Sequence, residues 1–220
     1  MGKTISLTAS DGHSFEAYEA KPDGDIKAGL VVIQEIFGVN DHMKEVTDEF
    51  AEHGYWAVCP AFFDRMQPGM VLSYSDMGAG RDAVGKISDD MVIADINAAA
   101  DHVRSAGKVG VIGYCWGGAM AFLGASKAKV DCGVSYYGTR IIQYSPEMKP
   151  VVPMQYHYGE TDKSFPMDAV KKVMDEQPEG EHFVYPDADH GFSCTDRPQY
   201  NADATALALK RSLAFFEANL

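Results

Sequence analysis

Residues 109–118 read Val-Gly-Val-Ile-Gly-Tyr-Cys-Trp-Gly-Gly, and they decide the fold of this 220-residue chain. The apolar start predicts a buried strand, and the pattern Gly-x-Cys-x-Gly follows before a predicted helix over about 116–126. Such a strand-to-helix turn forces its central residue, Cys115, into a strained backbone conformation and points the side chain out above the sheet. The free N–H groups at the start of the helix favour negative charge beside the thiol. Cys115 is therefore the candidate nucleophile, and its alternative is a buried structural cysteine.

Segments on both sides of this turn alternate between apolar runs and amphipathic stretches. The apolar runs predict strands over 30–34, 55–59, 109–113, 130–136, 154–158 and 183–185. The amphipathic stretches predict helices over 41–52, 88–105, 116–126, 166–176 and 202–218. Two more strands, 4–8 and 15–20, flank Asp11-Gly12, a pair typical of hairpin turns. This order predicts an α/β fold with a mostly parallel central sheet, helices on both faces and an antiparallel N-terminal hairpin, in a single domain over residues 1–220.

One long segment, residues 64–87, interrupts the alternation. It lacks a clear period and contains Gly69, Gly78, Gly80 and Gly85. Long connections of this kind often cover a binding site, so we predict an excursion or lid here.

Composition excludes several classes of function. Lys and Arg total 19 against 32 for Asp and Glu, a net charge of −13 that opposes binding to nucleic-acid phosphates or anionic membrane surfaces. No apolar stretch approaches the roughly 18–20 residues of a membrane span, and the N-terminus lacks the apolar core of a signal peptide. We expect a cytoplasmic protein with free thiols, because the four cysteines fit neither a disulfide-rich secreted domain nor a CxxC zinc site: Cys59, Cys115, Cys132 and Cys194.

Partners for the Cys115 thiol follow two later strands. In sites built on this turn, the acid and then the histidine come after the nucleophile along the chain. Asp162 follows the 154–158 strand and is the candidate carboxylate, with Glu160 as its competitor. His190 follows the 183–185 strand and is the candidate base, whereas Asp189 is expected to be a turn residue. The sequence thus predicts that a sulfur, an imidazole and a carboxylate meet above one edge of the sheet.

A metal site is a less favoured use of these residues, and the other histidines are not expected to be catalytic. Cys115, His190 and Cys194 match no common metal-ligand spacing, so a metal site is disfavoured. The remaining histidines are expected to be surface or packing residues: His13, His42, His53, His102, His157 and His182.

Several motifs together resemble the dienelactone hydrolase (carboxymethylenebutenolidase) family of the α/β-hydrolases, over nearly the whole chain. They are Gln-Glu-Ile-Phe-Gly-Val-Asn at 34–40, Gly54-Tyr55 leading to Pro60, the 109–118 run, Tyr136-Tyr137-Gly138, Asp162 and His190-Gly191-Phe192. The resemblance implies hydrolysis of a small-molecule ester or lactone, without cofactor or metal. Cys115 would attack the carbonyl and form a thioester, His190 would move the proton, and Asp162 would hold the imidazole.

The resemblance implies three further roles near the nucleophile. Glu35 is expected to interact with the Cys115 thiol, and its alternative role is a structural carboxylate bonded to the backbone. The backbone N–H groups of Ile36 and Trp116 would form the oxyanion hole, the site that stabilises the negative oxygen of the reaction intermediate.

One position departs from the family pattern. Well-known members bind a substrate carboxylate with two arginines, one in the lid and one four residues after the histidine, where this chain has Cys194. Arg81 is the lid candidate for substrate binding. Arg197 is the candidate from the histidine loop, with capping of the last helix as its alternative. Tyr137 is predicted to line the pocket or to pack beneath it.

Two hypotheses of different class follow. The first is an ester or lactone hydrolase that uses the Cys-His-Asp triad, and hydrolysis of a peptide bond is a less favoured variant of it. The second is a redox-responsive or ligand-binding thiol protein on the same scaffold. It predicts a disulfide between Cys115 and Cys194 under mild oxidant and no ester hydrolysis. The sequence does not set the oligomeric state.

Overall fold

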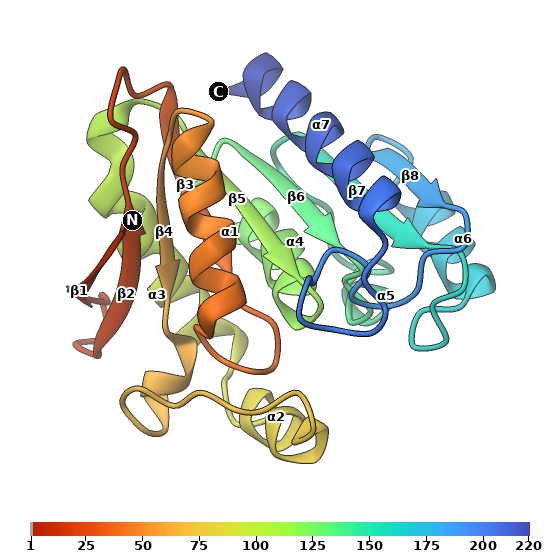
Figure 1. Cartoon of the computed structure of the whole chain (residues 1–220), viewed down its shortest axis with the longest axis horizontal. Coiled ribbons are helices and arrows are strands. Elements are labelled where there is room, and N and C mark those ends of the chain that lie inside the picture. Colours follow the sequence, from red (N-terminus) through yellow and green to blue (C-terminus); the bar gives the residue numbers. More distant parts are fainter. Residues whose placement is uncertain (1) are drawn as a thin grey trace.

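The chain folds around one eight-stranded sheet, described for residues 2–220 by a computed structural model (Figure 1). The strand order is β1-β2-β4-β3-β5-β6-β7-β8. β1 and β2 pair as an antiparallel hairpin, β2 pairs antiparallel with β4, and the other neighbours are parallel. The strands are β1 Lys3–Thr8, β2 Ser14–Ala20, β3 Ala28–Ile33, β4 Tyr55–Pro60, β5 Val109–Tyr114, β6 Cys132–Tyr136, β7 Met154–Gly159 and β8 Glu181–Tyr185.

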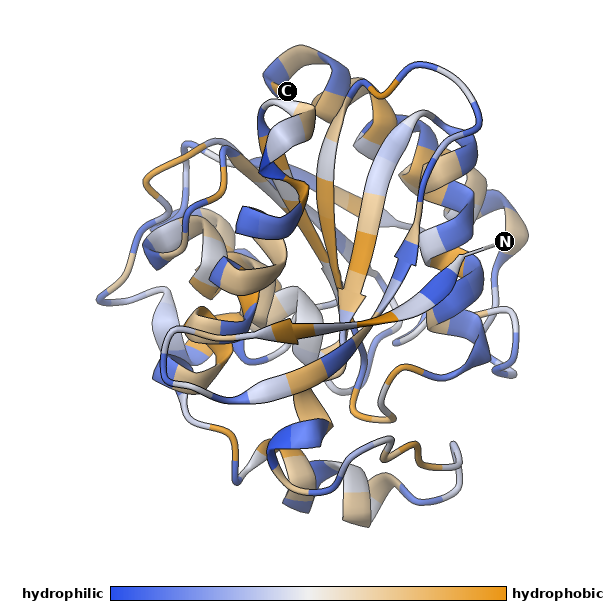
Figure 2. Ribbon diagram, turned by 90° about the vertical axis from the view of Figure 1, so that its left-hand side faces the viewer, coloured by the Kyte–Doolittle hydropathy of each residue, from blue (hydrophilic) through white to orange (hydrophobic). Residues whose placement is uncertain are grey.

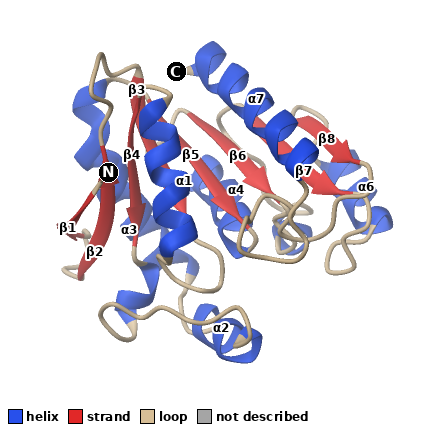
Figure 3. Cartoon of the chain, viewed as in Figure 1, coloured by secondary structure: helices blue, strands red, loops and turns tan. Residues whose placement is uncertain are grey.

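Helices cover both faces of this sheet, as Figure 3 shows. One apolar core lies between the sheet and α3, α4 and α6, and the other lies between the sheet and α1 and α7. Side-chain caps begin three of them, since Asn40, Ser88 and Asn201 each accept a hydrogen bond from a first-turn N–H of α1, α3 or α7. The α-helices are α1 Asp41–Glu52, α2 Met77–Val84, α3 Asp89–Val103, α4 Trp116–Lys127, α5 Ile141–Tyr144, α6 Met167–Glu176 and α7 Ala202–Asn219.

The central strands are buried throughout because helices cover the sheet on both sides. Every residue of β3, β5, β6 and β7 is buried, and Figure 2 shows the hydrophobic colouring of the strands inside the molecule. Helix α4 is buried from Trp116 to Ala125, as expected for a helix at the centre of one face. None of the helices in residues 2–220 has the length and apolar character needed to cross a bilayer.

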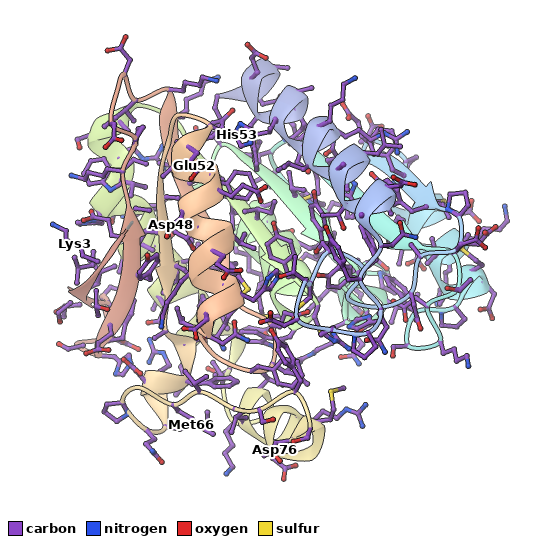
Figure 4. The ribbon with its side chains drawn as sticks, viewed as in Figure 1. Lys3, Asp48, Glu52, His53, Met66 and Asp76 are labelled. Atoms are coloured by element: carbon purple, nitrogen blue, oxygen red, sulfur yellow. The ribbon has the colours of Figure 1, made fainter. Side chains whose placement is uncertain are left out.

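The N-terminal hairpin is fastened to the body by exposed and half-buried polar contacts. The Arg65 guanidinium donates to both carboxylate oxygens of Asp95 at 2.8 and 2.7 Å and to Asp11 at 2.8 Å, and Asp95 is fully buried. On the other face Asp48, labelled on α1 in Figure 4, accepts hydrogen bonds from Tyr18 and from the Gly2 backbone. These bonds join β1 and β2 to helices on both faces of the sheet.

The predicted α/β architecture is confirmed, with its mostly parallel sheet, two helical layers and N-terminal hairpin. Two local expectations differ from the structure. The segment 64–87 is partly regular, because it contains the short helix α2 and the end of a 3-10 helix, Phe62–Arg65. The short helix α5 was not expected at all. We retain two proposals: that residues 1–220 form one domain, since the strands share one sheet, and that 64–87 acts as a lid below the strand ends (Figure 1).

Candidate active site

Cys115 lies at a sharp turn between β5 and α4. Its backbone φ is 56° and ψ is −118°, a strained conformation for a residue other than glycine. Two glycines make the turn possible. A Cβ on Gly113 would lie 1.9 Å from the carbonyl oxygen of Gly117, and one on Gly117 would lie 2.4 Å from that of Ile33. The turn leaves the Cys115 side chain half-buried at the carboxyl edge of the sheet.

The structure brings the imidazole of His190 between the thiol and a carboxylate. His190 Nε2 lies 3.1 Å from Cys115 Sγ, and its Nδ1 lies 2.8 Å from Asp162 Oδ2. The other oxygen of Asp162 accepts from the backbone N–H groups of Ser164 and Phe165, so the carboxylate is held from two sides. The three side chains follow β5, β7 and β8, and they form one chain of hydrogen bonds from sulfur to carboxylate.

Two other acidic residues near the site, Glu160 and Asp189, do not contact the His190 imidazole as Asp162 does. Glu160 is exposed to solvent, whereas Asp162 is 2 % exposed and contacts the imidazole. Asp189 accepts a hydrogen bond from the backbone N–H of His190 at 2.6 Å, which is the local bond of a turn residue.

The charge state of His190 is set by opposing effects. Burial disfavours the imidazolium, but the adjacent Cys115 sulfur and the hydrogen bond to Asp162 outweigh burial and raise the pKa of His190 to about 10. A positive imidazolium is therefore favoured next to a negative sulfur.

Two backbone N–H groups of residues near Cys115 and His190 lack a hydrogen-bond acceptor in residues 2–220. Trp116 is the first residue of α4, and Ile36 follows β3 in the loop that Gly117 approaches. Neither N–H donates a hydrogen bond to any acceptor in residues 2–220. The loop that contains Ile36 is hydrogen-bonded to the lid segment, since Leu72 N–H donates to Phe37 O at 2.9 Å. Free donors at a helix N-terminus and in a neighbouring loop suit a developing oxyanion.

Glu35 does not make the contact with the Cys115 thiol that the resemblance implies. Its side chain is 1 % exposed, and neither carboxylate oxygen has a hydrogen-bond partner in residues 2–220. Its nearest cation is Arg197, whose Nη1 lies 3.5 Å from Oε1, at the outer limit of a hydrogen bond. Burial raises the pKa of Glu35, and the charges of Arg197 and His190 oppose this rise. The thiol is directed at His190 instead.

A small cavity of about 160 Å³ opens beside Cys115 and His190. Helix α2 supplies Met77, Arg81 and Val84 to its wall, so the segment predicted to be a lid lines the cavity. Arg81, the predicted substrate-binding residue of the lid, is thus one of the residues that line the cavity. The loop after β6 adds Arg140, which sequence reasoning missed although it follows a strand that ends at this edge. The remaining lining residues are Ile36, Trp116, Thr139 and Ser164.

Tyr137 and Arg197 are not among the residues that line this cavity. Tyr137 is fully buried and its ring packs against His190, with ring centres 5.1 Å apart. Arg197 is 11 % exposed and pairs with Glu35. Both lie behind the site.

The remaining cysteines give no sign of a second reactive thiol. All four are free. Cys194 is fully buried, its Sγ lies 3.3 Å from the Tyr74 hydroxyl, and burial raises its pKa to about 11. No group of three or more His, Cys, Asp or Glu side chains in residues 2–220 is arranged to hold a metal ion.

Comparisons with known proteins agree on one family. The model of the "Dienelactone hydrolase family" matches residues 15–220. The carboxymethylenebutenolidase of Pseudomonas putida is 36% identical over 225 residues, covering 96% of this chain and 94% of that protein. A crystal structure assigned as a dienelactone hydrolase from Klebsiella pneumoniae superimposes with a TM-score of 0.84 at 27% identity, over 98% of this chain and 99% of that one. A dienelactone hydrolase-like promiscuous phosphotriesterase from metagenomic libraries shares the fold, with a TM-score of 0.77 at 19% identity over 99% and 98% of the two chains.

Proposed function

Because this chain belongs to the dienelactone hydrolase family, we propose that it hydrolyses a small ester or lactone through a thioester on Cys115. The observation that carries the proposal is the continuous hydrogen-bonded chain from Cys115 Sγ through His190 to Asp162. Each group also has the chemistry required, namely a soft nucleophile, a base with two nitrogens and a buried carboxylate that holds one of them.

The first half of the reaction acylates the sulfur. The Cys115 thiolate attacks the carbonyl carbon, and the carbonyl oxygen becomes negative next to the N–H groups of Ile36 and Trp116. The bond to the leaving oxygen then breaks, and the His190 imidazolium gives its proton to the departing alkoxide or enolate. A thioester and an alcohol result, or a thioester with a tethered hydroxyl where the substrate is a lactone.

The second half releases the acid. His190, now neutral, accepts a proton from water as the oxygen attacks the thioester carbonyl, and the C–S bond breaks to regenerate the thiolate. Asp162 accepts a hydrogen bond at His190 Nδ1 throughout, so Nε2 remains directed at the sulfur. A thiolate leaves easily as well as attacking readily, so activated esters and enol lactones suit this site better than amides.

The cavity limits the substrate to a small molecule. Its volume of about 160 Å³ is below the range of most drug-sized ligand sites, and α2 forms much of its wall. We assign substrate contact to Arg81 and Arg140 on the cavity wall. We assign Glu35 and Arg197 to a buried charge pair behind it. The free cysteines support a reducing, cytoplasmic setting, and the net charge of −13 supports a protein that does not bind nucleic acid or anionic membranes.

The redox alternative has less support. It requires Cys115 to pair with Cys194, but that thiol is fully buried and contacts the Tyr74 hydroxyl. Oxidation at this position would need the lid to open first.

The test compares the wild type with Cys115→Ala and Cys115→Ser on p-nitrophenyl acetate and on a panel of lactones. We expect burst release of p-nitrophenol from the wild type and a mass increase of one acetyl group on the peptide that contains Cys115. Cys115→Ala should lose turnover by at least about 10³-fold, as removal of a nucleophile does in triad hydrolases. Full activity in Cys115→Ala, at unchanged thermal stability, would refute the assignment.

A further inference from the structure

Tyr137 occupies a strained position directly against the candidate base. It follows β6 with a backbone φ of 40°, a region that favours glycine, yet it carries a large side chain that is fully buried. Its ring meets the His190 imidazole at 62°, with ring centres 5.1 Å apart. A strained residue with a large buried side chain persists where surrounding contacts hold it, and such residues cluster at functional sites.

The hydroxyl of Tyr137 reaches the loop that carries His190. Tyr137 Oη lies 2.7 Å from Ser193 Oγ, and both groups are buried. Ser193 comes three residues after His190, and local backbone bonds stiffen the loop between them, because Phe192 N–H donates to Asp189 O and Cys194 N–H donates to Gly191 O. This hydroxyl bond therefore connects the end of β6 to the histidine loop.

We propose that the Tyr137–Ser193 hydroxyl pair is a positioning device that holds the His190 imidazole in line between Asp162 and Cys115. The inference rests on the proposed role of His190 as the base. The ring of Tyr137 packs against the His190 imidazole, and its hydroxyl bond to Ser193 holds the loop that carries His190 in place. Without the bond, the loop gains freedom and Nε2 spends less time within reach of the sulfur. Small displacements of this kind are costly, since about 1 Å can lower a rate 10²-fold.

The chain contains a matched control for this pair. Tyr136, the residue before Tyr137, places its hydroxyl 2.9 Å from Ser212 Oγ of α7. This bond is also between a buried tyrosine and a buried serine, but it joins the sheet to α7 and not to the histidine loop. Removal of either tyrosine hydroxyl breaks one buried hydrogen bond and should cost similar stability, so Tyr137→Phe and Tyr136→Phe separate a structural effect from a positioning effect.

The test uses Tyr137→Phe and Ser193→Ala, singly and together, beside Tyr136→Phe and Ser212→Ala. One readout is kcat and KM for an activated ester. The other is the rate of Cys115 alkylation by iodoacetamide against pH, which needs no substrate turnover and responds to the imidazolium beside the sulfur.

We expect Tyr137→Phe and Ser193→Ala each to lower kcat about 10- to 100-fold with KM unchanged. Each should also move the midpoint of the alkylation profile to higher pH. The double variant should lose no more than either single variant, because both remove the same bond. Tyr136→Phe should lower the melting temperature by a similar amount while kcat and the alkylation midpoint stay as in the wild type. Ser212→Ala should lower the melting temperature further, because Ser212 Oγ also lies 3.1 Å from His157 Nε2 and 3.0 Å from Ala208 O, and it should also leave kcat and the midpoint unchanged.

The proposal is overturned if the control pair changes kcat and the midpoint as much as the test pair does, or if the test pair changes neither. Ser193→Ala decides the matter alone should Tyr137→Phe fail to fold. Failure of the proposed function gives a different result, since a wild type that cleaves no ester or lactone still reports the position of His190 through the alkylation profile.

Discussion

Replacing Asp162 by asparagine should reverse the orientation of protons in the candidate triad. Asp162 Oδ1 accepts from Ser164 N–H at 2.7 Å and Phe165 N–H at 3.0 Å, while Oδ2 faces His190 Nδ1. An asparagine has one oxygen, and the two backbone donors retain it. Its amide N–H then points at His190, which must accept at Nδ1 and carry its own proton on Nε2. That proton faces the Cys115 sulfur, so the imidazole loses its ability to take the thiol proton.

Two contributions set the size of the effect. A hydrogen bond to a charged group contributes about 1.5–3 kcal/mol. At about 1.36 kcal/mol per decade, its loss alone is about 10- to 150-fold in rate. The reversed tautomer adds to this loss, and the same substitution in serine triads lowers kcat about 10⁴-fold. For Asp162→Asn we expect kcat/KM to fall about 10³- to 10⁴-fold.

The assay compares Asp162→Asn with Glu160→Gln, two carboxylate-to-amide changes two residues apart. Glu160 is exposed, so its variant should hydrolyse p-nitrophenyl acetate within about twofold of the wild type, as surface substitutions usually do. Thermal unfolding checks that both variants fold. The reasoning is refuted if Asp162→Asn retains more than a tenth of the activity, or if Glu160→Gln is equally impaired.

Four further predictions concern the charge on His190, the pH dependence of stability, a buried ion pair and the nucleophile turn. Cys115→Ala removes the charge that contributes most to raising the pKa of His190, so an NMR titration of its ring should give a value well below about 10, and an unchanged midpoint contradicts the proposed pairing. The pKa of His190 is higher in the folded than in the unfolded chain, so protonation of His190 stabilises the folded wild type fully below about pH 6.5. This stabilisation is lost as the pH rises towards 10, and the loss of free energy of unfolding over this range should be smaller in Cys115→Ala. Asp95→Asn breaks a buried ion pair and should lower the free energy of unfolding in urea by about 3–5 kcal/mol, against at most about 1 kcal/mol for Asp101→Asn in an exposed pair; equal effects argue against burial as the cause. Gly113→Ala should give no soluble folded protein by circular dichroism, because the new Cβ would lie 1.9 Å from a backbone oxygen, and a native-like spectrum contradicts this.

The sheet and the meeting of three side chains could be predicted from sequence for one physical reason. Parallel strands end at the same edge of a sheet, so the positions of Cys115, Asp162 and His190 after three parallel strands were enough to place them together. Strands such as β3 and β5 were visible in the sequence because burial on both faces of a sheet favours continuous apolar runs.

Features that depend on tertiary contact were not predictable. Helix α2 has a weak local pattern with two internal glycines, and close packing holds it in place: a Cβ on Gly80 would lie 2.4 Å from Ile36 O. The ion pair of Glu35 and Arg197 joins residues from distant parts of the chain, and no spacing rule connects them. For the same reason the pattern could not decide whether Tyr137 lines the pocket or packs beneath it, whereas in the structure Tyr137 is fully buried against His190.

The two strained residues of the site share one means of support. Cys115 and Tyr137 both have positive φ, and each is the first residue after a central strand. Each also donates its backbone N–H to the next strand over, Cys115 to Tyr136 O at 3.0 Å and Tyr137 to His157 O at 2.8 Å. The ladder of the parallel sheet therefore continues through the strained residues. Since these bonds are made by the backbone, side-chain variants at either position should keep the turn, and loss of activity in them then reports chemistry and not collapse of the site.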